Sequence, residues 1–362
     1  MSSDREAEKA AFLADNGLGQ AVRERLAGDA STRLYERLRT PAGASLIFMD
    51  QPPNAETEPC PPAASEAERQ RMGYNALARL AAGRVEAFLS VAGYLKTRGF
   101  SAPEIVAADA PAGLAVLEDL GDDLYARLLE SDADEAELYD AATDALVRLH
   151  AEAPPPVLNG APGWPLLAYD DLALKTGGLM FLEWWPKYAG LPPFSAEQAA
   201  AWEALCAPIR ARGVAGASVF CHRDYHAENL IWLPARQGVA RVGMLDFQDA
   251  VRAHPAWDVS MLLHDGRRDV SPEREQAVLA RYLAARPEVD AARFLADYHA
   301  LGALNVSRIL FIFARQVAGF GRPKYAAFMP RMWRYLDQCL ADPELAGLKA
   351  WFAANVVREP RA

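Results

Sequence analysis

The segment 218–249 restricts the possible folds of this 362-residue chain more than any other part of the sequence. Within it, two short apolar runs at 230–234 and 241–245 flank a polar connection that contains a glycine. This pattern predicts a β-hairpin. Asn229 precedes the first strand and Asp246 follows the second, and an antiparallel pair places such positions next to each other. We therefore expect an amide oxygen and a carboxylate to converge on one point.

Asp224 extends this group, because it ends a His222-Arg-Asp triplet one short loop before the hairpin. Kinase catalytic loops use the same order, with an asparagine five residues after the aspartate and a later Asp-Phe pair. Phosphoryl transfer requires the protein to orient a hydroxyl group and to hold Mg²⁺ on the nucleotide phosphates. One carboxylate accepts the proton, and hard oxygen ligands hold the metal. The pattern favours a kinase, and the alternative is that these polar residues only cap turns.

Length, charge and cysteine content narrow the class of protein further. A chain of 362 residues with 51% hydrophobic residues can form two lobes that share a cleft. The net charge of -10 argues against a nucleic-acid binder and favours a small, neutral or locally compensated substrate. The four cysteines show no paired spacing, so neither a zinc site nor a disulfide framework is predicted. We see no signal sequence and no apolar run of membrane-spanning length, and we expect a cytoplasmic protein.

The first 50 residues predict a helical start followed by a β-hairpin. Residues 1–27 carry helical periodicity and end at a Gly28-Asp29 turn. Strands are expected at 33–38 and 44–49, on either side of a turn that contains proline and glycine. The small-residue loop 28–32 can bring backbone N–H groups close to phosphates, as the glycine-rich loop of a kinase does. The alternative for this loop is a plain surface turn.

A proline-rich segment and an inserted helix separate this hairpin from two further strands. Residues 50–64 contain five prolines and predict a linker or flap, and a capping box at Ser65 opens a helix to about residue 82. A helix at 84–98 and strands at 104–108 and 114–117 follow. The segment 118–121 then suits a hinge whose backbone groups face an adenine edge, and the alternative is a simple strand-to-helix turn.

From residue 123 onward the sequence is mostly helical. We expect helices at 123–130, 135–152, 169–188, 195–212, 255–264, 272–285, 291–316 and 325–340, with a proline-rich break at 153–165. The chain therefore predicts an α+β fold of two lobes. We expect residues 1–120 to form a small nucleotide-binding lobe, in which 50–82 is the proline-rich loop plus the inserted helix. Residues 121–362 should form a larger helical lobe with the catalytic loop and the acceptor site.

Several motifs resemble those of one known family, the aminoglycoside phosphotransferase-like kinases, whose fold is that of the protein kinases. The segments HRDYHAEN at 222–229 and LDFQDA at 245–250 look like the catalytic and metal-binding segments of that family. Further motifs are similar to those of the anomeric sugar kinases, which phosphorylate C1 of N-acetylmuramate and N-acetylglucosamine: GDASTR at 28–33, MDQPP at 49–53, LEDLG at 117–121 and PAWD at 255–258. The resemblance covers most of the chain, and the inserted helix at 65–82 is the main part outside it.

The resemblance implies a role for each segment. It implies that Asp224 is the catalytic base and that Asn229 and Asp246 are Mg²⁺ ligands. ATP is the implied phosphate donor. Three residues of the loop before the first hairpin are implied to contact the ATP phosphates: Ser31, Thr32 and Arg33. Three more are implied to border the adenine: Glu118, Asp119 and Leu120. The implied reaction converts ATP and an amino sugar to a sugar 1-phosphate and ADP, within a peptidoglycan recycling route towards UDP-sugars.

One departure from the wider kinase pattern concerns the lysine of the third strand, which contacts the α- and β-phosphates of ATP. The segment 44–50 contains no lysine, and Met49 stands about where it would be. The anomeric sugar kinases share this lack. We expect Arg33, at the exit of the preceding loop, to neutralise the phosphates instead. The alternative is that Arg33 is a solvated strand residue.

The acceptor pocket is expected in the helical lobe beside the catalytic loop. Glu183 and Trp185 offer a carboxylate and a flat aromatic face to a sugar, although paired tryptophans on a helix are also typical of a core. Tyr225, His226 and Glu228 lie inside the catalytic loop and are further candidates for acceptor contacts. Asp258 is expected to order that loop and not to touch the sugar.

N-acetylmuramate differs from N-acetylglucosamine by a lactyl carboxylate, which predicts a basic residue in the pocket. Arg308 and Arg315 are the candidates, because they lie seven residues apart and thus on one face of a helix. The alternative for both arginines is ordinary salt bridging on a solvated face.

Two other functions remain open from the sequence. Another kinase of the same superfamily would act on an aminoglycoside, choline or homoserine, and a cationic substrate would favour an acid-lined pocket. The missing lysine suggests a nucleotide-binding pseudokinase, but the joint presence of Asp224, Asn229 and Asp246 argues against it. A protein kinase is not expected, because only eight residues separate Asp246 from Pro255, too few for an activation segment. The oligomeric state, the anomer selected and the preference between the two sugars are not fixed by the sequence.

Overall fold

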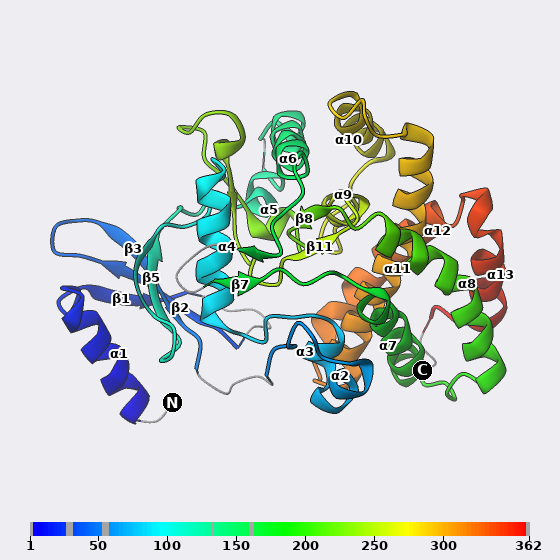
Figure 1. Cartoon of the computed structure of the whole chain (residues 1–362), viewed down its shortest axis with the longest axis horizontal. Helices are drawn as coiled ribbons and strands as arrows, with labels where there is room; N and C mark the ends of the chain where they lie inside the picture. Colours follow the sequence, from blue (N-terminus) through cyan, green and yellow to red (C-terminus); the bar gives the residue numbers. More distant parts are fainter. Residues whose placement is uncertain (1–2, 27–31, 53–57, 132, 159–162, 360–362) are drawn as a thin grey trace.

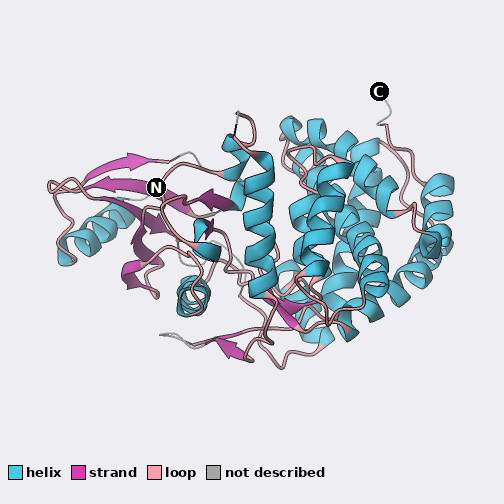
Figure 2. Cartoon of the chain, turned by 90° about the horizontal axis from the view of Figure 1, so that it is seen from above, coloured by secondary structure: helices cyan, strands magenta, loops and turns pink. Residues whose placement is uncertain are grey.

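The computed structural model describes residues 3–26, 32–52, 58–131, 133–158 and 163–359. Strands gather at one end of the molecule and helices at the other, which gives two lobes (Figure 1; Figure 2). The strand-rich lobe contains a five-stranded antiparallel sheet with the order β1-β2-β3-β5-β4. Its strands are β1 (Val22–Arg25), β2 (Leu34–Arg39), β3 (Ser45–Asp50), β4 (Ile105–Asp109) and β5 (Leu114–Glu118).

The two faces of this sheet belong to different cores, because side chains alternate between the faces of a strand. Phe48 and Val116 pack with Leu13 of α1 (Ser3–Asp15) in a small cluster on one face. Met49 and Leu117, at the neighbouring positions, belong to the main core together with α4 (Val85–Thr97). The sheet therefore lies between α1 and α4, and α4 also faces the helical lobe (Figure 1).

The helical lobe is built around α11 (Ala291–Ala318), which is buried over most of its length. The other helices of this lobe are α5 (Tyr125–Leu128), α6 (Glu135–Leu149), α7 (Asp171–Ala189), α8 (Ala196–Ala215), α9 (Ala256–Leu263), α10 (Pro272–Ala284), α12 (Met329–Cys339) and α13 (Ala346–Asn355). Short 3₁₀ turns lie at Ala227–Asn229, Gly238–Arg241, Pro323–Phe328 and Pro343–Leu345. In length and composition α11 could span a membrane, but 78% of its apolar window is buried inside the fold.

Three short antiparallel strand pairs lie within or beside the helical lobe. They are β6 (Val157–Leu158) with β7 (Trp164–Pro165), β8 (Val219–Cys221) with β11 (Val251–Ala253), and β9 (Leu230–Trp232) with β10 (Val242–Met244). The pair β9–β10 is the hairpin expected at 230–245, and its register sets Met244 opposite Leu230. The catalytic loop 222–229 runs from β8 to β9, so both of its ends are fixed by strand pairing.

The two-lobed α+β fold agrees with the prediction, and two of the expected elements are wrong. The helical start ends at Asp15, and Val22–Arg25 is an edge strand, in which Arg23 forms a cross-strand ion pair with Glu36. Gly73 breaks the helix expected at 65–82 into α2 (Glu66–Met72) and α3 (Tyr74–Leu77). The backbone φ of Gly73 is 94°, a value that glycine adopts readily and that interrupts a helix. The predicted turn at Gly28-Asp29 lies outside the described residues. The boundary between the two lobes at residue 120 stays a prediction.

Candidate active site

Asp258, at the start of α9, anchors the catalytic loop. Its fully buried carboxylate accepts hydrogen bonds from the backbone N–H groups of His222 (2.6 Å) and Arg223 (2.8 Å) and from the Cys221 thiol (3.0 Å). Arg223 has a φ of 80°, a strained conformation for a residue other than glycine, so the turn needs such support. This geometry agrees with the expectation that Asp258 orders the loop.

His150 supports Asp258 from the end of α6. Its Nε2 lies 3.6 Å from the Asp258 carboxylate, and its Nδ1 lies 2.9 Å from the Tyr282 hydroxyl. Burial lowers the pKa of His150, so the ring is neutral near pH 7. Burial alone would raise the pKa of Asp258, but the nearby His150 ring and the hydrogen bond from the Cys221 thiol hold that pKa below its usual value. The loop is thus held by a buried, ionised carboxylate.

Asp224, Asn229 and Asp246 meet at one end of the β9–β10 hairpin. The Asn229 amide nitrogen donates to the Asp224 backbone carbonyl (2.9 Å), which leaves Oδ1 as the available end of that side chain. The N–H of Leu245 donates to the Asn229 carbonyl (2.9 Å), so Asp246 follows directly beside Asn229. The side chains of Asp224 and Asp246 are 28% and 50% exposed, so both remain open to a ligand.

The oxygens of Asn229 and Asp246 fit a Mg²⁺ site that substrate phosphates complete. Mg²⁺ prefers hard oxygen ligands and is commonly held by one or two protein side chains together with phosphates and water. The described ranges contain no cluster of three or more His, Cys, Asp or Glu side chains that could hold a metal ion by itself. A metal at this hairpin would therefore depend on the nucleotide for its remaining ligands.

Arg33 reaches from the start of β2 to this same hairpin. Its Nη1 donates to the Gln248 side-chain oxygen (2.7 Å) and lies 3.3 Å from Oδ1 of Asp246. Since Arg33 is only 8% exposed, it is not a solvated strand residue. Of the other two residues expected at the phosphates, Thr32 shares a side-chain hydrogen bond with Gln51 (3.0 Å), and Ser31 lies outside the described residues.

The segment expected at the adenine lies at the end of β5. Glu118 pairs with Arg236 (2.5 Å) and Asp119 with Arg37 (2.8 Å), so both carboxylates already have partners. Leu120 is buried, and Gly121 follows it with a φ of 91°. A contact between this segment and adenine would therefore come from its backbone groups and from the Leu120 side chain.

A cavity of about 260 Å³, here called the acceptor cavity, opens beside Asp224 in the helical lobe. Arg308 and Arg315 of α11 both line it, as their spacing predicts. Arg308 is 8% exposed, with Nη2 3.7 Å from Oδ1 of Asp224 and Nε donating to Asn305 (3.0 Å). Within the described part of the chain the guanidinium group of Arg315 has neither an ion pair nor a hydrogen bond. The alternative of ordinary salt bridges on a solvated face therefore fits neither arginine.

Two candidates for sugar contacts are corrected by the structure. Trp185 is fully buried, donates its Nε1–H to the Val357 carbonyl (3.0 Å) and packs against Trp333, so it belongs to the core. Tyr225 is also fully buried, and its hydroxyl donates to the Ala142 carbonyl (3.0 Å). Both side chains face away from any solvent-filled space, because packing within the helical lobe encloses them.

The remaining sugar candidates differ in position. Glu183 is exposed on α7, forms an ion pair with Lys187 (2.6 Å), and is not among the residues that line the acceptor cavity. His226 and Glu228 are half-buried in the catalytic loop, with Nε2 of His226 3.4 Å from the Asn229 amide nitrogen. They lie close to the reacting end of the site, so a contact with the acceptor stays a prediction for both.

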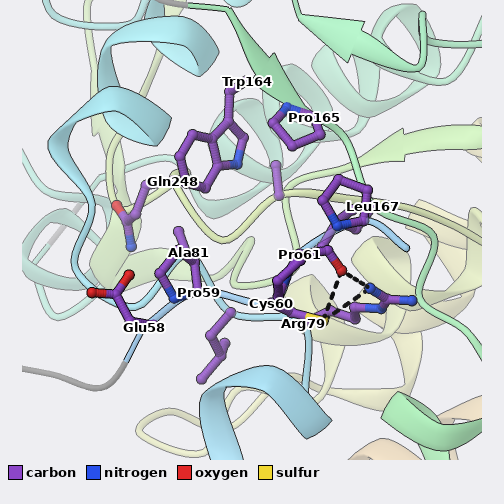
Figure 3. A pocket seen from close by; sticks show the side chains of 13 residues that line it. Glu58, Pro59, Cys60, Pro61, Arg79, Ala81, Trp164, Pro165, Leu167 and Gln248 are labelled. Atoms are coloured by element: carbon purple, nitrogen blue, oxygen red, sulfur yellow. Dashed lines mark hydrogen bonds between the residues drawn. The ribbon is translucent and has the colours of Figure 1, made fainter. Parts of the chain in front are cut away.

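A second cavity of about 300 Å³ lies next to the Asp246 segment and has mostly apolar walls. Figure 3 shows Trp164 and Pro165 on one side of it, across from Cys60 and Arg79. Leu80 lines both cavities, so the residues after α3 form a partition between them. Asp224, the expected base, lines the acceptor cavity and is not among the residues that line the second cavity.

Sequence reasoning missed three aromatic residues that line the acceptor cavity, Tyr74, Phe311 and Phe320. Phe320 is 55% exposed between Gly319 and Gly321, and a large aromatic residue within such a turn is a signal that could have been recognised. Tyr74 gave no such signal, because it lies in the insert, and only the folded chain brings it to α11. Gln248 was also missed, since its role depends on its contact with Arg33.

The fold and the catalytic hairpin define a phosphotransferase of the kinase-like type. Residues 22–295 match the phosphotransferase enzyme family, APH, and the chain belongs to this family. The N-acetylmuramate/N-acetylglucosamine kinase of Caulobacter vibrioides is 66% identical over 362 residues, which cover 100% of this chain and 99% of that protein. The protein of the same name from Pseudomonas aeruginosa is 30% identical over 331 residues, which cover 88% of this chain and 84% of that protein.

Solved structures share the fold at low sequence identity. An ethanolamine kinase from Plasmodium vivax has a TM-score of 0.54 at 12% identity, with 91% of this chain and 84% of that chain covered. The ADP-bound aminoglycoside phosphotransferase APH(2'')-Ib has a TM-score of 0.53 at 13% identity, with 93% and 97% covered. These similarities confirm the predicted fold class, and the family match confirms that the chain is a phosphotransferase.

Proposed function

We propose that this enzyme transfers the γ-phosphoryl group of ATP to the anomeric C1 hydroxyl of N-acetylmuramate and N-acetylglucosamine. The observation that carries the proposal is the 66% identity, over the whole chain, to a kinase named for these two sugars. The acceptor cavity supports it, because it joins a carboxylate able to serve as base to a chamber of suitable size for one sugar ring. The product would be a sugar 1-phosphate, within a cytoplasmic route that recycles peptidoglycan sugars.

In this reaction Asp224 orients the C1 hydroxyl and accepts its proton as the bond to phosphorus forms. Arg308 lies beside Asp224 at the inner end of the cavity, where its guanidinium can stabilise negative charge on the acceptor oxygen. The Oδ1 of Asn229 and the Asp246 carboxylate would hold the metal ion, and bound Mg²⁺ would neutralise charge on the ATP phosphates.

Arg33 is the residue that we propose in place of the missing lysine. Its guanidinium already faces Asp246 and Gln248 from the loop before β2, within reach of phosphates bound at that hairpin. Arginine binds phosphate oxygens through two parallel N–H donors, which suits a β- or γ-phosphate better than a single ammonium group does. Thr32 and the backbone of Glu118 to Leu120 complete the proposed nucleotide contacts.

The charge of the acceptor cavity argues against the rival acceptors. Choline and aminoglycosides are cations, and a pocket for them would present several carboxylates, whereas three arginines and the single carboxylate of Asp224 line this one. The presence of Asp224, Asn229 and Asp246 at one point likewise favours catalysis over a nucleotide-binding pseudokinase.

The test is ADP release with ATP and Mg²⁺ against N-acetylmuramate, N-acetylglucosamine, glucose, choline and kanamycin, with Asp224→Asn as the control. Turnover of both N-acetyl sugars, abolished in the variant, is the expected result. Turnover of choline or kanamycin alone would replace the proposed substrates but keep the catalytic residues. ATP binding without turnover of any acceptor would favour the pseudokinase.

A further inference from the structure

The outer half of the acceptor cavity presents hydrogen-bond donors that have no acceptor. Arg315 lies about 10 Å along α11 from Arg308, at 1.5 Å per residue, and so marks the end of the cavity away from Asp224. No carboxylate pairs with Arg315 among the residues that the structure describes. The Tyr74 hydroxyl also lacks a hydrogen-bond partner there. A cavity wall that carries unused donors and positive charge suits an anionic group on the ligand.

Aromatic rings hold the Arg315 guanidinium in position. Its Cζ lies 5.2 Å from the ring centroid of Phe320, 5.8 Å from that of Trp184 and 6.0 Å from that of Tyr74. Cation–π contacts of this kind restrain the side chain but leave its N–H groups free for hydrogen bonds. A restrained guanidinium loses less conformational entropy when it binds an anion, so the site is organised before the ligand arrives.

Tyr74 belongs to the inserted segment 65–82, and contacts within this segment and with α11 hold it in position. Gly73 ends α2 and starts α3, and the Arg69 side chain donates to the carbonyls of Ala76 (3.1 Å) and Leu77 (2.8 Å) at the end of α3. The Tyr74 ring packs edge-on against Phe311 of α11. Burial raises the pKa of Tyr74, so its hydroxyl keeps the proton that it would donate to an anion.

The insert is also tied to the reacting end of the site. The N–H of Ala81 donates to the Asp249 carboxylate (2.6 Å), three residues beyond Asp246, and Arg223 of the catalytic loop donates to the Arg79 carbonyl (3.3 Å). Arg69 and Arg79 both bind Asp170 at the start of α7, at 2.6 and 2.9 Å. The wall that carries Tyr74 is therefore fixed relative to the catalytic loop by contacts on both sides.

We propose that Tyr74 and Arg315 form a carboxylate receptor that determines specificity, with the inserted segment 65–82 serving to position Tyr74. The receptor binds the lactyl carboxylate of N-acetylmuramate, and N-acetylglucosamine leaves it unused. This inference rests on the proposed function, since it assigns the far end of the same cavity to the substituent that differs between the two sugars. Tyr74 and the insert are thereby specificity elements, and Asp224 remains the reacting group.

The experiment compares wild type, Tyr74→Phe and Arg315→Gln in calorimetric binding of each sugar and in kcat/KM for each sugar. Tyr74→Phe removes only the hydroxyl and keeps the ring on Phe311 and Arg315. We expect about tenfold weaker binding and about tenfold lower kcat/KM for N-acetylmuramate, with both values for N-acetylglucosamine within about twofold. Arg315→Gln should shift the preference in the same direction and further, because it removes a full charge.

Tyr188→Phe is the matched control, because that tyrosine is also half-buried but lies outside the cavity lining. Equal losses for the two sugars, or unchanged values for N-acetylmuramate in Tyr74→Phe, would overturn the receptor. Binding of both sugars by the wild type without turnover would instead overturn the proposed function. The calorimetric affinities of the variants would still show whether Tyr74 and Arg315 bind the carboxylate. A wild type that binds N-acetylmuramate no better than Tyr74→Phe does would end the proposal.

Discussion

Replacement of Asp258 by asparagine tests how the catalytic loop is held. In the wild type, one buried carboxylate accepts hydrogen bonds from His222 N–H, Arg223 N–H and the Cys221 thiol. Asparagine keeps a single acceptor oxygen and turns an NH₂ group towards a second donor. A hydrogen bond to a charged group contributes about 1.5–3 kcal/mol, and a buried donor left without a partner costs about 1–3 kcal/mol. We expect the free energy of unfolding to fall by about 3 kcal/mol.

Catalysis should suffer as well, because the loop carries both Asp224 and Asn229. A displacement of about 1 Å at a catalytic group can cost about 100-fold in rate, so kcat should fall by about that factor. Urea unfolding and steady-state kinetics at saturating ATP measure the two effects. Asp337→Asn serves as control, since this exposed carboxylate pairs with Arg358 and its loss should change stability by at most about 0.5 kcal/mol. A loss below about 1 kcal/mol with normal kcat in Asp258→Asn would refute the reasoning.

Three further predictions concern the nucleotide end of the site and the pH dependence of stability. Arg33→Ala should raise the KM for ATP about tenfold, because a buried guanidinium beside Asp246 is lost, and an unchanged KM would remove Arg33 from the nucleotide site. Asp246→Asn should raise the Mg²⁺ concentration for half-maximal activity about tenfold or more, and a normal Mg²⁺ titration would exclude it as a ligand. Between pH 6.5 and 5.5 the free energy of unfolding should fall by about 1–2 kcal/mol, because burial lowers the pKa of His150 and His222 and only the unfolded chain then takes up their protons. Equal stability at the two pH values in urea titrations would show that the two histidines do not titrate differently on unfolding.

The catalytic hairpin could be predicted because its geometry depends on residues that are close together in the sequence. Asn229 and Asp246 flank two apolar strands, and strand pairing alone brings such positions together. The same holds for the spacing of Arg308 and Arg315, since seven residues on a helix return to one face. In each case short-range geometry fixes where the side chains meet, without knowledge of the rest of the fold.

Other features depend on contacts between distant segments and could not be predicted. Trp185 and Tyr225 are core residues because the helices around them close, which a sequence motif does not reveal. The segment 22–25 has a run of charged residues that fits a helix as well as an edge strand, and its ion pair with Glu36 exists only once the sheet forms. Tyr74 reaches the acceptor cavity only because Gly73 breaks the insert and α3 packs on α11.

The most direct test of the proposed reaction is the position of the new phosphate in the product. ³¹P NMR of the product formed from N-acetylglucosamine, ATP and Mg²⁺ would show the proton to which the phosphorus is coupled. The account predicts coupling to the single anomeric proton, together with loss of the reducing end. Coupling to the two protons at C6, with the reducing end intact, would contradict phosphorylation at C1.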